Sequence, residues 1–332
     1  SATRTINWQV DDGQLANHVS NVGTSTINLT AVNDAPVNTV PGAQTTNEDT
    51  AAVISGLQIA DVDAGTGTMT VTLSVAHGTV NVAAGTGVTL TTNGTSSVQL
   101  SGTLSAINTL LATASAVTYT PTLNYNGADT LTMTTNDGGN TGSGGALTAT
   151  SQVAINITPV NDQPTIGLNI TSSASAEDQG VPSGAGFGQT IASLSGISGQ
   201  ALDVEGAAVG LAFVAPIPAT YGKAWYSIDG GTTWLDLTAK LATATETNAF
   251  LLNATARVYF QGNTNLNGTL GSATVHSWDG TDGGTVGAYK NISALEGPSG
   301  AYSATTGALN FGVSAVNDAP VNTVPSAQTA DE

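Results

Sequence analysis

The sequence contains no cysteine, and only five of its 332 residues are lysine or arginine. The absence of cysteine excludes disulfides and thiol chemistry. So few basic residues, against 23 acidic ones and a net charge of −18, exclude a nucleic-acid-binding protein, because nothing could neutralise the phosphates. The same balance argues against docking on an anionic membrane surface. No apolar run is long enough for membrane insertion of this segment.

Charged residues of either sign are scarce, at 8% of the chain against about 25% in ordinary globular proteins. Hydrophobic residues nevertheless reach 40%, and Val, Ile and Leu alternate with Thr in many short runs. Such alternation indicates folded β-structure and not disorder. The length is sufficient for two or three domains, each with its own core.

The chain repeats itself. Residues 31–46, AVNDAPVNTVPGAQTT, return almost unchanged at 315–330, and PVNDQP at 159–164 is a shorter third copy. Each Asn-Asp pair follows an alternating run and precedes a proline, which ends a strand and favours an extended connection. Recurrence at this spacing indicates tandem domains.

These junctions predict the domain boundaries. We expect a complete repeat over 35–162 and an enlarged one over 163–318, which contains an additional hairpin motif. Residues 1–34 match the C-terminal part of a repeat, and residues 319–332 match the start of the next. The sequence is thus expected to be a segment of a longer repetitive protein.

Period-2 alternation predicts the fold class. Strands are expected at 68–75, 78–84, 87–92, 115–122 and 129–135, bounded by Gly, Asn, Asp and Pro. One segment differs: over 104–114 the leucines and isoleucine fall on one helical face, which predicts a short helix. Many short strands with little helix predict an all-β chain of tandem immunoglobulin-like β-sandwiches in an extended string.

The acidic residues are concentrated in four elements that recur in the same order. These are an acidic pair, an Asp-Val-acid element, an Asp-Gly turn and the Asn-Asp linker, and they hold 18 of the 23 acids. In a β-sandwich we expect the Asp-Gly turn and the linker at one end of a domain. The acidic pair and the Asp-Val-acid element are expected at the facing end of the next. The candidate ligands are Asp12, Asn33, Asp34, Glu48, Asp61 and Asp63 for the first junction, Asp137, Asn161, Asp162, Glu177, Asp203 and Glu205 for the second, and Asp279, Asn317, Asp318 and Glu332 for the third.

Six or seven carboxylates in one place repel each other unless a cation joins them. Hard oxygen ligands in that number suit Ca²⁺, which accepts six to eight oxygens, whereas Mg²⁺ retains its waters and requires a stricter octahedron. The alternative is that these residues are solvated turn residues, since Asp and Asn favour turns. The ordered recurrence of four acidic elements favours calcium as the bound ion.

The order of acidic pair, Asp-x-acid, Asp-Gly and Asn-Asp-x-Pro resembles the cadherin-like tandem repeats of giant bacterial surface adhesins of the RTX type. The VNDAP linker is similar to the inter-domain linker of cadherins, whose Asn and Asp ligate calcium. DVDAG and NEDTA are also typical of these bacterial repeats. The resemblance implies cadherin-like domains in a secreted protein of the bacterial cell surface, where calcium stiffens a string of domains for adhesion or biofilm formation. Glu205 departs from the pattern by replacing an Asp.

YSIDGGTTW at 226–234 matches the Asp-box pattern and resembles the hairpin of that name in sialidases, where it lies away from the chemistry. It predicts a hairpin with a buried Trp234. The alternative is a glycan-contacting surface built on Trp225 and Trp234. GAGFG at 184–188 lacks the strand–turn–helix context and the Lys of a phosphate loop.

No element predicts catalysis. His18, His77 and His276 stand alone in the sequence and are expected at the surface, not as zinc ligands. Paired carboxylates could imitate a glycosidase site, but an active site does not usually recur at every linker. We therefore expect no enzyme.

The function expected is that of a structural extender segment in a large extracellular adhesin or surface fibre, with neighbouring repeats as partners. An alternative is a glycan- or protein-binding module in the second repeat, which holds all the tryptophans except Trp8. A third possibility is lateral packing of copies into a filament or surface layer.

Overall fold

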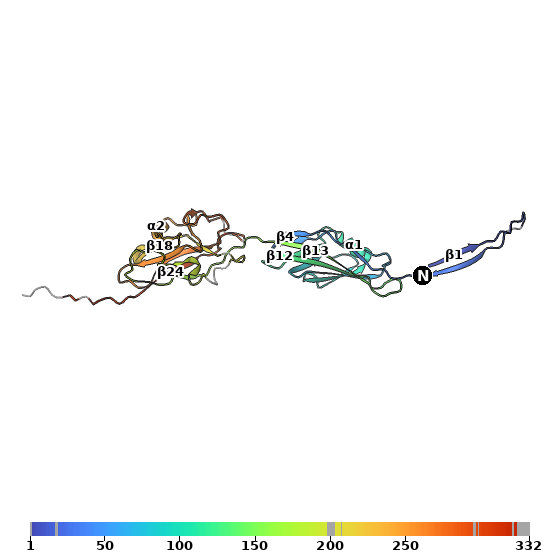
Figure 1. Ribbon diagram of the computed structural model, residues 1–332, viewed down its shortest axis with the longest axis horizontal. Helices are drawn as coiled ribbons and strands as arrows, with labels where there is room; N and C mark the ends of the chain where they lie inside the picture. The colour runs from blue at the N-terminus through green and yellow to red at the C-terminus, as the bar shows by residue number, and fades with distance from the viewer. Residues whose placement is uncertain are drawn as a thin grey trace, which may run out of the picture. The chain divides into compact units, whose positions relative to one another are not determined.

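The computed structural model describes residues 2–16, 19–197, 203–206, 208–294, 297, 299–320 and 322–323. The chain forms two compact units, Ser1–Val160 (unit 1) and Asn161–Glu332 (unit 2), which are described separately. In both units strands form most of the regular secondary structure, as the alternation predicted (Figure 1). No helix in the described residues is long and apolar enough to cross a membrane.

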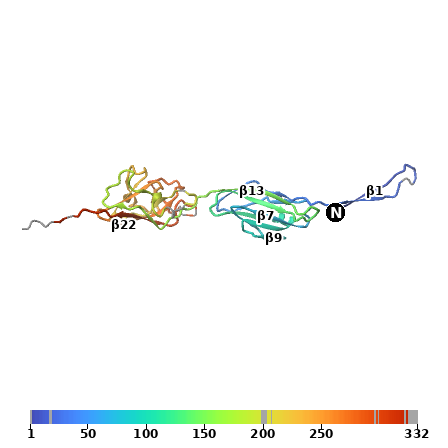
Figure 2. The same cartoon turned by 60° about the horizontal axis from the view of Figure 1, so that its bottom comes forward.

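Unit 1 begins with an antiparallel hairpin and continues as a β-sandwich. The hairpin pairs β1 (Ala2–Trp8) with β2 (Gly23–Leu29). The larger sheet of the sandwich has the order β4-β13-β12-β7-β10-β9 (Figure 2), with β4 (Gln44–Asn47), β7 (Thr68–Ser74), β9 (Val88–Thr91), β10 (Ser97–Thr103), β12 (Gly127–Asn136) and β13 (Thr148–Thr158). The smaller sheets are β5-β11-β8, with β5 (Ala52–Val53), β8 (Gly78–Val82) and β11 (Val117–Pro121), and β3-β6, with β3 (Val37–Thr39) and β6 (Gln58–Ala60).

The strand pattern explains the core of unit 1. Along β7, Met69, Val71 and Leu73 are fully buried, while the threonines between them lie on the outer face. Burying each such side chain contributes about 1.5–3 kcal/mol. The predicted helix is α1 (Leu104–Leu111); Thr103 caps it by accepting a hydrogen bond from the amide of Ala106. The helix predicted over 104–114 is confirmed, although it ends at Leu111.

Unit 2 is a second β-sandwich. One sheet has the order β14-β24-β22-β17-β20-β23, with β15 also paired to β24; its strands are β14 (Asn169–Thr171), β15 (Ser175–Ala176), β17 (Gly210–Phe213), β20 (Ala249–Leu252), β22 (Gly268–Trp278), β23 (Tyr289–Lys290) and β24 (Gly307–Ser314). The other is β16-β21-β18-β19, with β16 (Gln189–Thr190), β18 (Gly222–Ser227), β19 (Leu235–Asp236) and β21 (Arg257–Gly262). Three short helical segments were not predicted: η1 (Ile191–Ser193), η2 (Ala219–Tyr221) and α2 (Leu237–Leu241).

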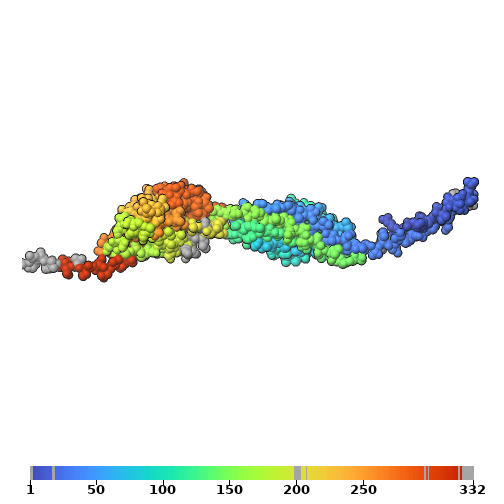
Figure 3. All heavy atoms as spheres, viewed as in Figure 1, coloured from blue at the N-terminus to red at the C-terminus, as the bar shows by residue number. Residues whose placement is uncertain are grey.

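The enlarged connections of unit 2 bury a second, smaller core. Residues 279–306 separate β22 from β24, whereas residues 137–147 suffice between β12 and β13 of unit 1. Trp278 and Tyr302 are buried in this small core, together with Leu251 and Ile292. In Figure 3, residues around 270–300, coloured dark orange, form one side of unit 2.

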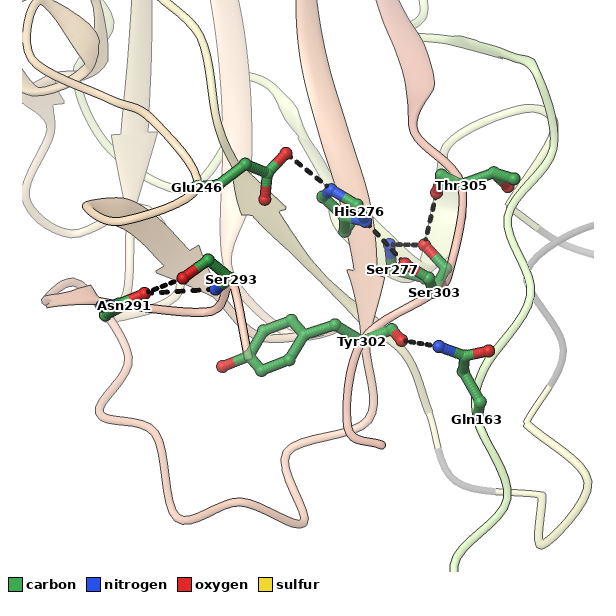
Figure 4. A network of polar contacts seen from close by, with 9 residues as sticks. All are labelled: Gln163, Glu246, His276, Ser277, Asn291, Ser293, Tyr302, Ser303 and Thr305. Atoms are coloured by element: carbon green, nitrogen blue, oxygen red, sulfur yellow. Dashed lines mark hydrogen bonds and ion pairs between the residues drawn. The ribbon is translucent and has the colours of Figure 1, made fainter. Parts of the chain in front are cut away.

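The same segment makes the surface assignment of His276 wrong. His276 is 2% exposed; its Nδ1 lies 2.6 Å from the Ser303 carbonyl oxygen, and its Nε2 lies 3.0 Å from a carboxylate oxygen of Glu246 (Figure 4). The end of β22 is buried on both faces because residues 279–306 cover the side that alternation would leave exposed. His77 is exposed, as expected, and stacks on Tyr125. His18 lies outside the described residues.

Candidate metal sites at the ends of the domains

Strand direction decides which acidic residues meet. In unit 1, β12 is antiparallel to β13, so the residue that follows β12, Asp137, lies at the end of the sandwich where the chain enters. In contrast, β4 is parallel to β13, so Glu48 lies at the end where the chain leaves. In unit 2, β15 is parallel to β24 and β22 is antiparallel to it. Glu177, after β15, therefore lies at the exit end, and Asp279, after β22, lies at the entry end.

At the entry end of unit 1, Asn33 and Asp137 are joined. Asn33 is 6% exposed, and its side-chain amide donates to Asp137 Oδ2 at 2.7 Å and to the Gly145 carbonyl at 2.9 Å. Asp137 is 1% exposed and also accepts the backbone amides of Gly139 and Leu147. Burial would raise the pKa of Asp137, but hydrogen bonds from Leu147, Gly139 and Asn33 outweigh it and lower that pKa. Asp137 is therefore an anion fixed beside the linker.

Asp61 and Asp63 complete this entry cluster of unit 1, which consists of Asn33, Asp34, Asp61, Asp63 and Asp137. Asp61 Oδ1 accepts the amides of Asp63 and Ala64, and Asp63 Oδ2 accepts the amide of Asp34 at 3.0 Å. The other oxygens, Asp61 Oδ2 and Asp63 Oδ1, are buried, and no described residue donates a hydrogen bond to them. Burial, followed by the neighbouring carboxylate of Asp63, raises the pKa of Asp61.

Unit 2 forms the same arrangement from Asn161, Asp162, Asp203, Glu205 and Asp279, its entry cluster. Asn161 donates to Asp279 Oδ2 at 3.0 Å, and Glu205 Oε1 accepts the amide of Asp162 at 2.9 Å. Glu205 thus makes the bond that Asp63 makes in unit 1, despite its longer side chain. This substitution leaves the arrangement intact.

In this second cluster, Asp203 carries a buried carboxylate whose pKa is raised. Asp203 is 8% exposed, and its Oδ2 is buried without a donor among the described residues. Burial, with the charge of Glu205 close by, raises the pKa of Asp203 to about 6. Burial would also raise the pKa of Glu205, but its hydrogen bond with Asp203 outweighs this and lowers it. A buried anion costs several kcal/mol unless a partner compensates it, so a cation is the partner that these residues fit.

At the exit end of each unit, a buried glutamate binds the departing chain. Glu48 is 2% exposed, and its Oε1 accepts the amide of Val160 at 2.7 Å. Glu177, 5% exposed, accepts the amide of Val316 at the same distance. The second oxygen of each accepts an asparagine side chain at 3.3 Å, from Asn126 and from Asn267.

The residue after each glutamate is held in an unusual conformation. Asp49 and Asp178 have φ of +56° and +62°, a region that side chains other than Gly, Asn and Asp rarely adopt. Each caps the Asn-Gly turn of its unit, because Oδ1 accepts the amide of Asn124 at 2.8 Å or of Asn265 at 3.1 Å. The acidic pair therefore connects the exit end to the turn before β12 or β22.

The linker that leaves unit 2 places Asp318 close to the acidic pair Glu177 and Asp178. Slight desolvation and the charges of Asp178 and Glu177 raise the pKa of the exposed Asp318, whose side chain interacts directly with Asp178. Asn317 is exposed beside it. These four residues, Glu177, Asp178, Asn317 and Asp318, form the exit cluster of unit 2.

The structure corrects part of the expected grouping. We expected Asp137 with the second junction and Glu48 with the first, but Asp137 binds Asn33 and Glu48 binds the chain at Val160. Likewise, Asp279 belongs with Asn161 and not with the third junction, and Glu177, expected at the second junction, binds the third linker at Val316. The reason is that the strand before each Asp-Gly turn is antiparallel to the last strand of its domain.

Among the described candidates, Asp12 lies apart from these clusters. Asp12 is exposed in the loop between β1 and β2, where it accepts the amide of Gln14 at 3.1 Å. Glu332 lies outside the described residues. The candidates from the sequence do not include Asn126 and Asn267, although their recurrence in both repeats, two residues after Asn124 and Asn265, could have identified them.

No family model and no curated protein sequence matches this chain. Among solved structures, it is similar to protocadherin gamma B2 extracellular cadherin domains 1–5, with 14% identity over 96% of this chain and 47% of that chain and a TM-score of 0.45. It is also similar to the protocadherin gammaB4 extracellular domain (14% identity, 94% and 38%, TM-score 0.43) and to mouse cadherin-23 EC22–24 (13% identity, 95% and 74%, TM-score 0.41). The chain spans less than half the length of the two protocadherin chains. These three solved structures are cadherin extracellular domains.

Proposed function

We propose that this chain is a structural extender segment of a large extracellular adhesin or surface fibre, rigidified by Ca²⁺ at the linkers between its domains. One observation carries the proposal. Units 1 and 2 form the same five-residue entry cluster, and each leaves buried carboxylate oxygens without donors, on Asp61 and Asp63 in one and on Asp203 in the other. Solvated turn residues would not bury anionic oxygens in this way.

The two ends of a linker can be assembled from the two copies of one sequence. Residues 31–36 and 315–320 are both AVNDAP. In the first copy the Asn-Asp pair binds the domain that follows, through Asp137 and Asp63. In the second copy the linker binds the domain that precedes it, because the amide of Val316 donates to Glu177, and Asp318 lies close to Asp178. By repetition, we infer that each linker brings together carboxylates from both of its domains.

Calcium fits this donor set. The ligands would be the carboxylates of an entry cluster (Asp34, Asp61, Asp63 and Asp137, or Asp162, Asp203, Glu205 and Asp279) with those of an exit cluster, such as Glu48 or Glu177. Carboxylate and amide oxygens in this number suit the six to eight ligands of Ca²⁺ better than the octahedron of Mg²⁺. The bound ion would supply charge neutralisation and fixed geometry at the linker.

The mechanical consequence is loss of hinge freedom. An ion that binds the linker and both adjoining domain ends restrains a short connection that would otherwise be flexible. Because the ion binds only the folded arrangement, it also stabilises each domain, by about 2.7 kcal/mol at a concentration 100 times its Kd. A string of such domains would extend from a bacterial cell surface in a calcium-bearing medium, with neighbouring repeats as its first partners. This proposed role is structural and not enzymatic.

Thermal unfolding of the full chain tests the proposal. After dialysis against EDTA, calcium should raise Tm strongly, and an equal concentration of magnesium should not. The calcium effect should vanish when EDTA is added back. A melting curve that is the same in EDTA and in calcium would show that these carboxylates do not bind calcium.

A further inference from the structure

Unit 2 contains a cavity of about 440 Å³ beside the loop 184–188. Its floor is formed by β21 with the segment around β15, and Phe187 and Tyr259 supply aromatic surface. Polar lining comes from Ser172, Ser175, Gln179 and Gln189. Among the described residues that line it, none is acidic or basic, which is notable in a chain with a net charge of −18.

Two hydroxyls at this cavity lack a fixed hydrogen-bond partner. Ser172 is 8% exposed and Tyr259 is 7% exposed, and neither hydroxyl makes a hydrogen bond within the described part of the chain. Burial raises the pKa of Tyr259 and a side-chain contact with Ser175 lowers it, while the Ser175 hydroxyl donates its own proton to the Phe260 carbonyl. Buried hydroxyls without partners are costly and rare. Two of them in residues that line one cavity leave hydrogen-bonding capacity there that a ligand with both donors and acceptors could use.

The rim of the cavity is held firmly in place. Arg257 donates to the Phe187 carbonyl from Nε at 3.2 Å and from Nη2 at 3.0 Å, and to the Gly188 carbonyl at 2.7 Å. Trp234 Nε1 donates to the Gly184 carbonyl at 3.2 Å. The glycine-rich segment is thus a pre-formed wall, which reduces the ordering cost of binding.

The Asp-box hairpin supports this wall. Asp229 accepts the Ser227 hydroxyl at 2.7 Å and the Thr233 hydroxyl at 2.6 Å, which fixes the turn that carries Trp234. A Cβ on Gly231 would lie 2.8 Å from Ala185 Cα, so the hairpin and the loop are in close contact. Trp234 is half-buried against Tyr259, with ring centroids 6.2 Å apart. The predicted hairpin is present, and its Trp serves as an anchor for the loop.

The cavity belongs to an insertion that unit 1 lacks. Ten residues, 179–188, separate Asp178 from β16, whereas two residues, 50 and 51, separate Asp49 from the corresponding strand β5. Arg257, Trp234 and the Asp-box hairpin all hold this insertion in place. A domain that served only as a spacer would not need such support.

We propose that this cavity binds a neutral saccharide unit. Sugar hydroxyls both donate and accept, as Ser172 and Tyr259 require, and the apolar face of a sugar ring packs on aromatic side chains such as Phe187. A cation would need carboxylates, which the lining does not offer, and the strong negative charge of the chain disfavours an acidic sugar. The proposed site therefore differs from the glycan-contacting surface on Trp225 and Trp234 that the sequence offered as an alternative. Trp234 lies behind the wall, and Trp225 binds Gln261.

The test uses the full chain in calcium on a glycan array that carries neutral, sialylated and uronic-acid glycans. Hits are then quantified with methyl glycosides of glucose, galactose, mannose, fucose and N-acetylglucosamine by ligand-observed NMR. We expect binding to neutral sugars only. Tyr259→Phe and Ser172→Ala should each weaken it by about tenfold, because each removes one hydroxyl. Tyr221→Phe, which alters an exposed tyrosine of the same unit, should not.

Thermal unfolding of each variant separates binding from folding. Tyr259→Phe should keep the parental Tm, since its hydroxyl has no fixed partner to lose; if it unfolds, Ser172→Ala decides. Absence of binding to any neutral glycan, binding of acidic glycans or of peptides alone, or full affinity in both variants would overturn the proposal. Calcium dependence is not part of it, so failure of the calcium proposal would leave this test unaffected.

Discussion

The side-chain amide of Asn33 binds the carboxylate of Asp137, 104 residues further along the chain, at 2.7 Å. Asn161 makes the same bond to Asp279 at 3.0 Å. In each unit, a direct side-chain hydrogen bond thus attaches the linker to the domain that follows it.

The first prediction concerns this attachment. Asn33→Ala should lower the stability of unit 1 by about 1–3 kcal/mol, because the buried Asp137 loses a donor. Asn81→Ala, at an exposed position on β8, should change it by less than about 0.5 kcal/mol. Calorimetry of the full chain can assign the transition. Equal effects of the two variants would mean that the bond to Asp137 contributes nothing.

The second prediction is that removing the charges of Asp61 and Asp63 changes the stability in opposite directions in EDTA and in calcium. In EDTA, the double variant Asp61→Asn, Asp63→Asn should be at least as stable as the parent, because it removes two adjacent buried charges and Asn can still accept the turn amides. In calcium it should be less stable, because it loses the ion. Melting curves in EDTA, calcium and magnesium check this. Destabilisation of equal size in EDTA and in calcium would contradict a metal role.

A third prediction concerns the small core of unit 2. Asp282 is paired with Lys290 at 2.8 Å, with its side chain 10% exposed, and it also accepts the Tyr302 hydroxyl and Trp278 Nε1. Asp282→Asn should cost about 3 kcal/mol, because it removes the negative charge paired with the half-buried Lys290 and replaces one of the two acceptor oxygens with an amide group that cannot accept. Asp236→Asn, which breaks the more exposed pair with Lys223, should cost no more than about 1 kcal/mol from the pair itself. Urea unfolding measures both.

The fourth prediction concerns how the contribution of Asp282 to stability is lost at low pH. Burial would raise the pKa of Asp282, but Lys290, Tyr302 and Trp278 outweigh it and lower that pKa to about 2. A carboxyl whose pKa is lower in the folded state contributes stability above its unfolded pKa of 3.8, and this is lost as pH falls towards about 2. The difference in unfolding free energy between the parent and Asp282→Asn should therefore shrink over that interval. A difference independent of pH would contradict this origin.

The strands, the helix at Leu104 and the repeat could be predicted because they depend on local order. Val71 and Leu73 alternate with threonines along β7, and a side-chain period of two fixes the buried face wherever the strand packs. The recurrence of the Asn-Asp pairs needs no structure to be seen. The types of residue that form the entry clusters were thus identified from sequence alone.

Which residues meet was decided by the tertiary structure. Glu48 and Asp137 exchange ends because β4 is parallel to β13 while β12 is antiparallel to it, and strand direction is a property of sheet topology and not of composition. His276 is buried because a later segment covers its face of β22. Ser172 and Tyr259 reach one cavity from positions 87 residues apart. Local pattern determines which residues form strands and turns, but contacts between distant residues arise only when the sheets assemble and exclude water.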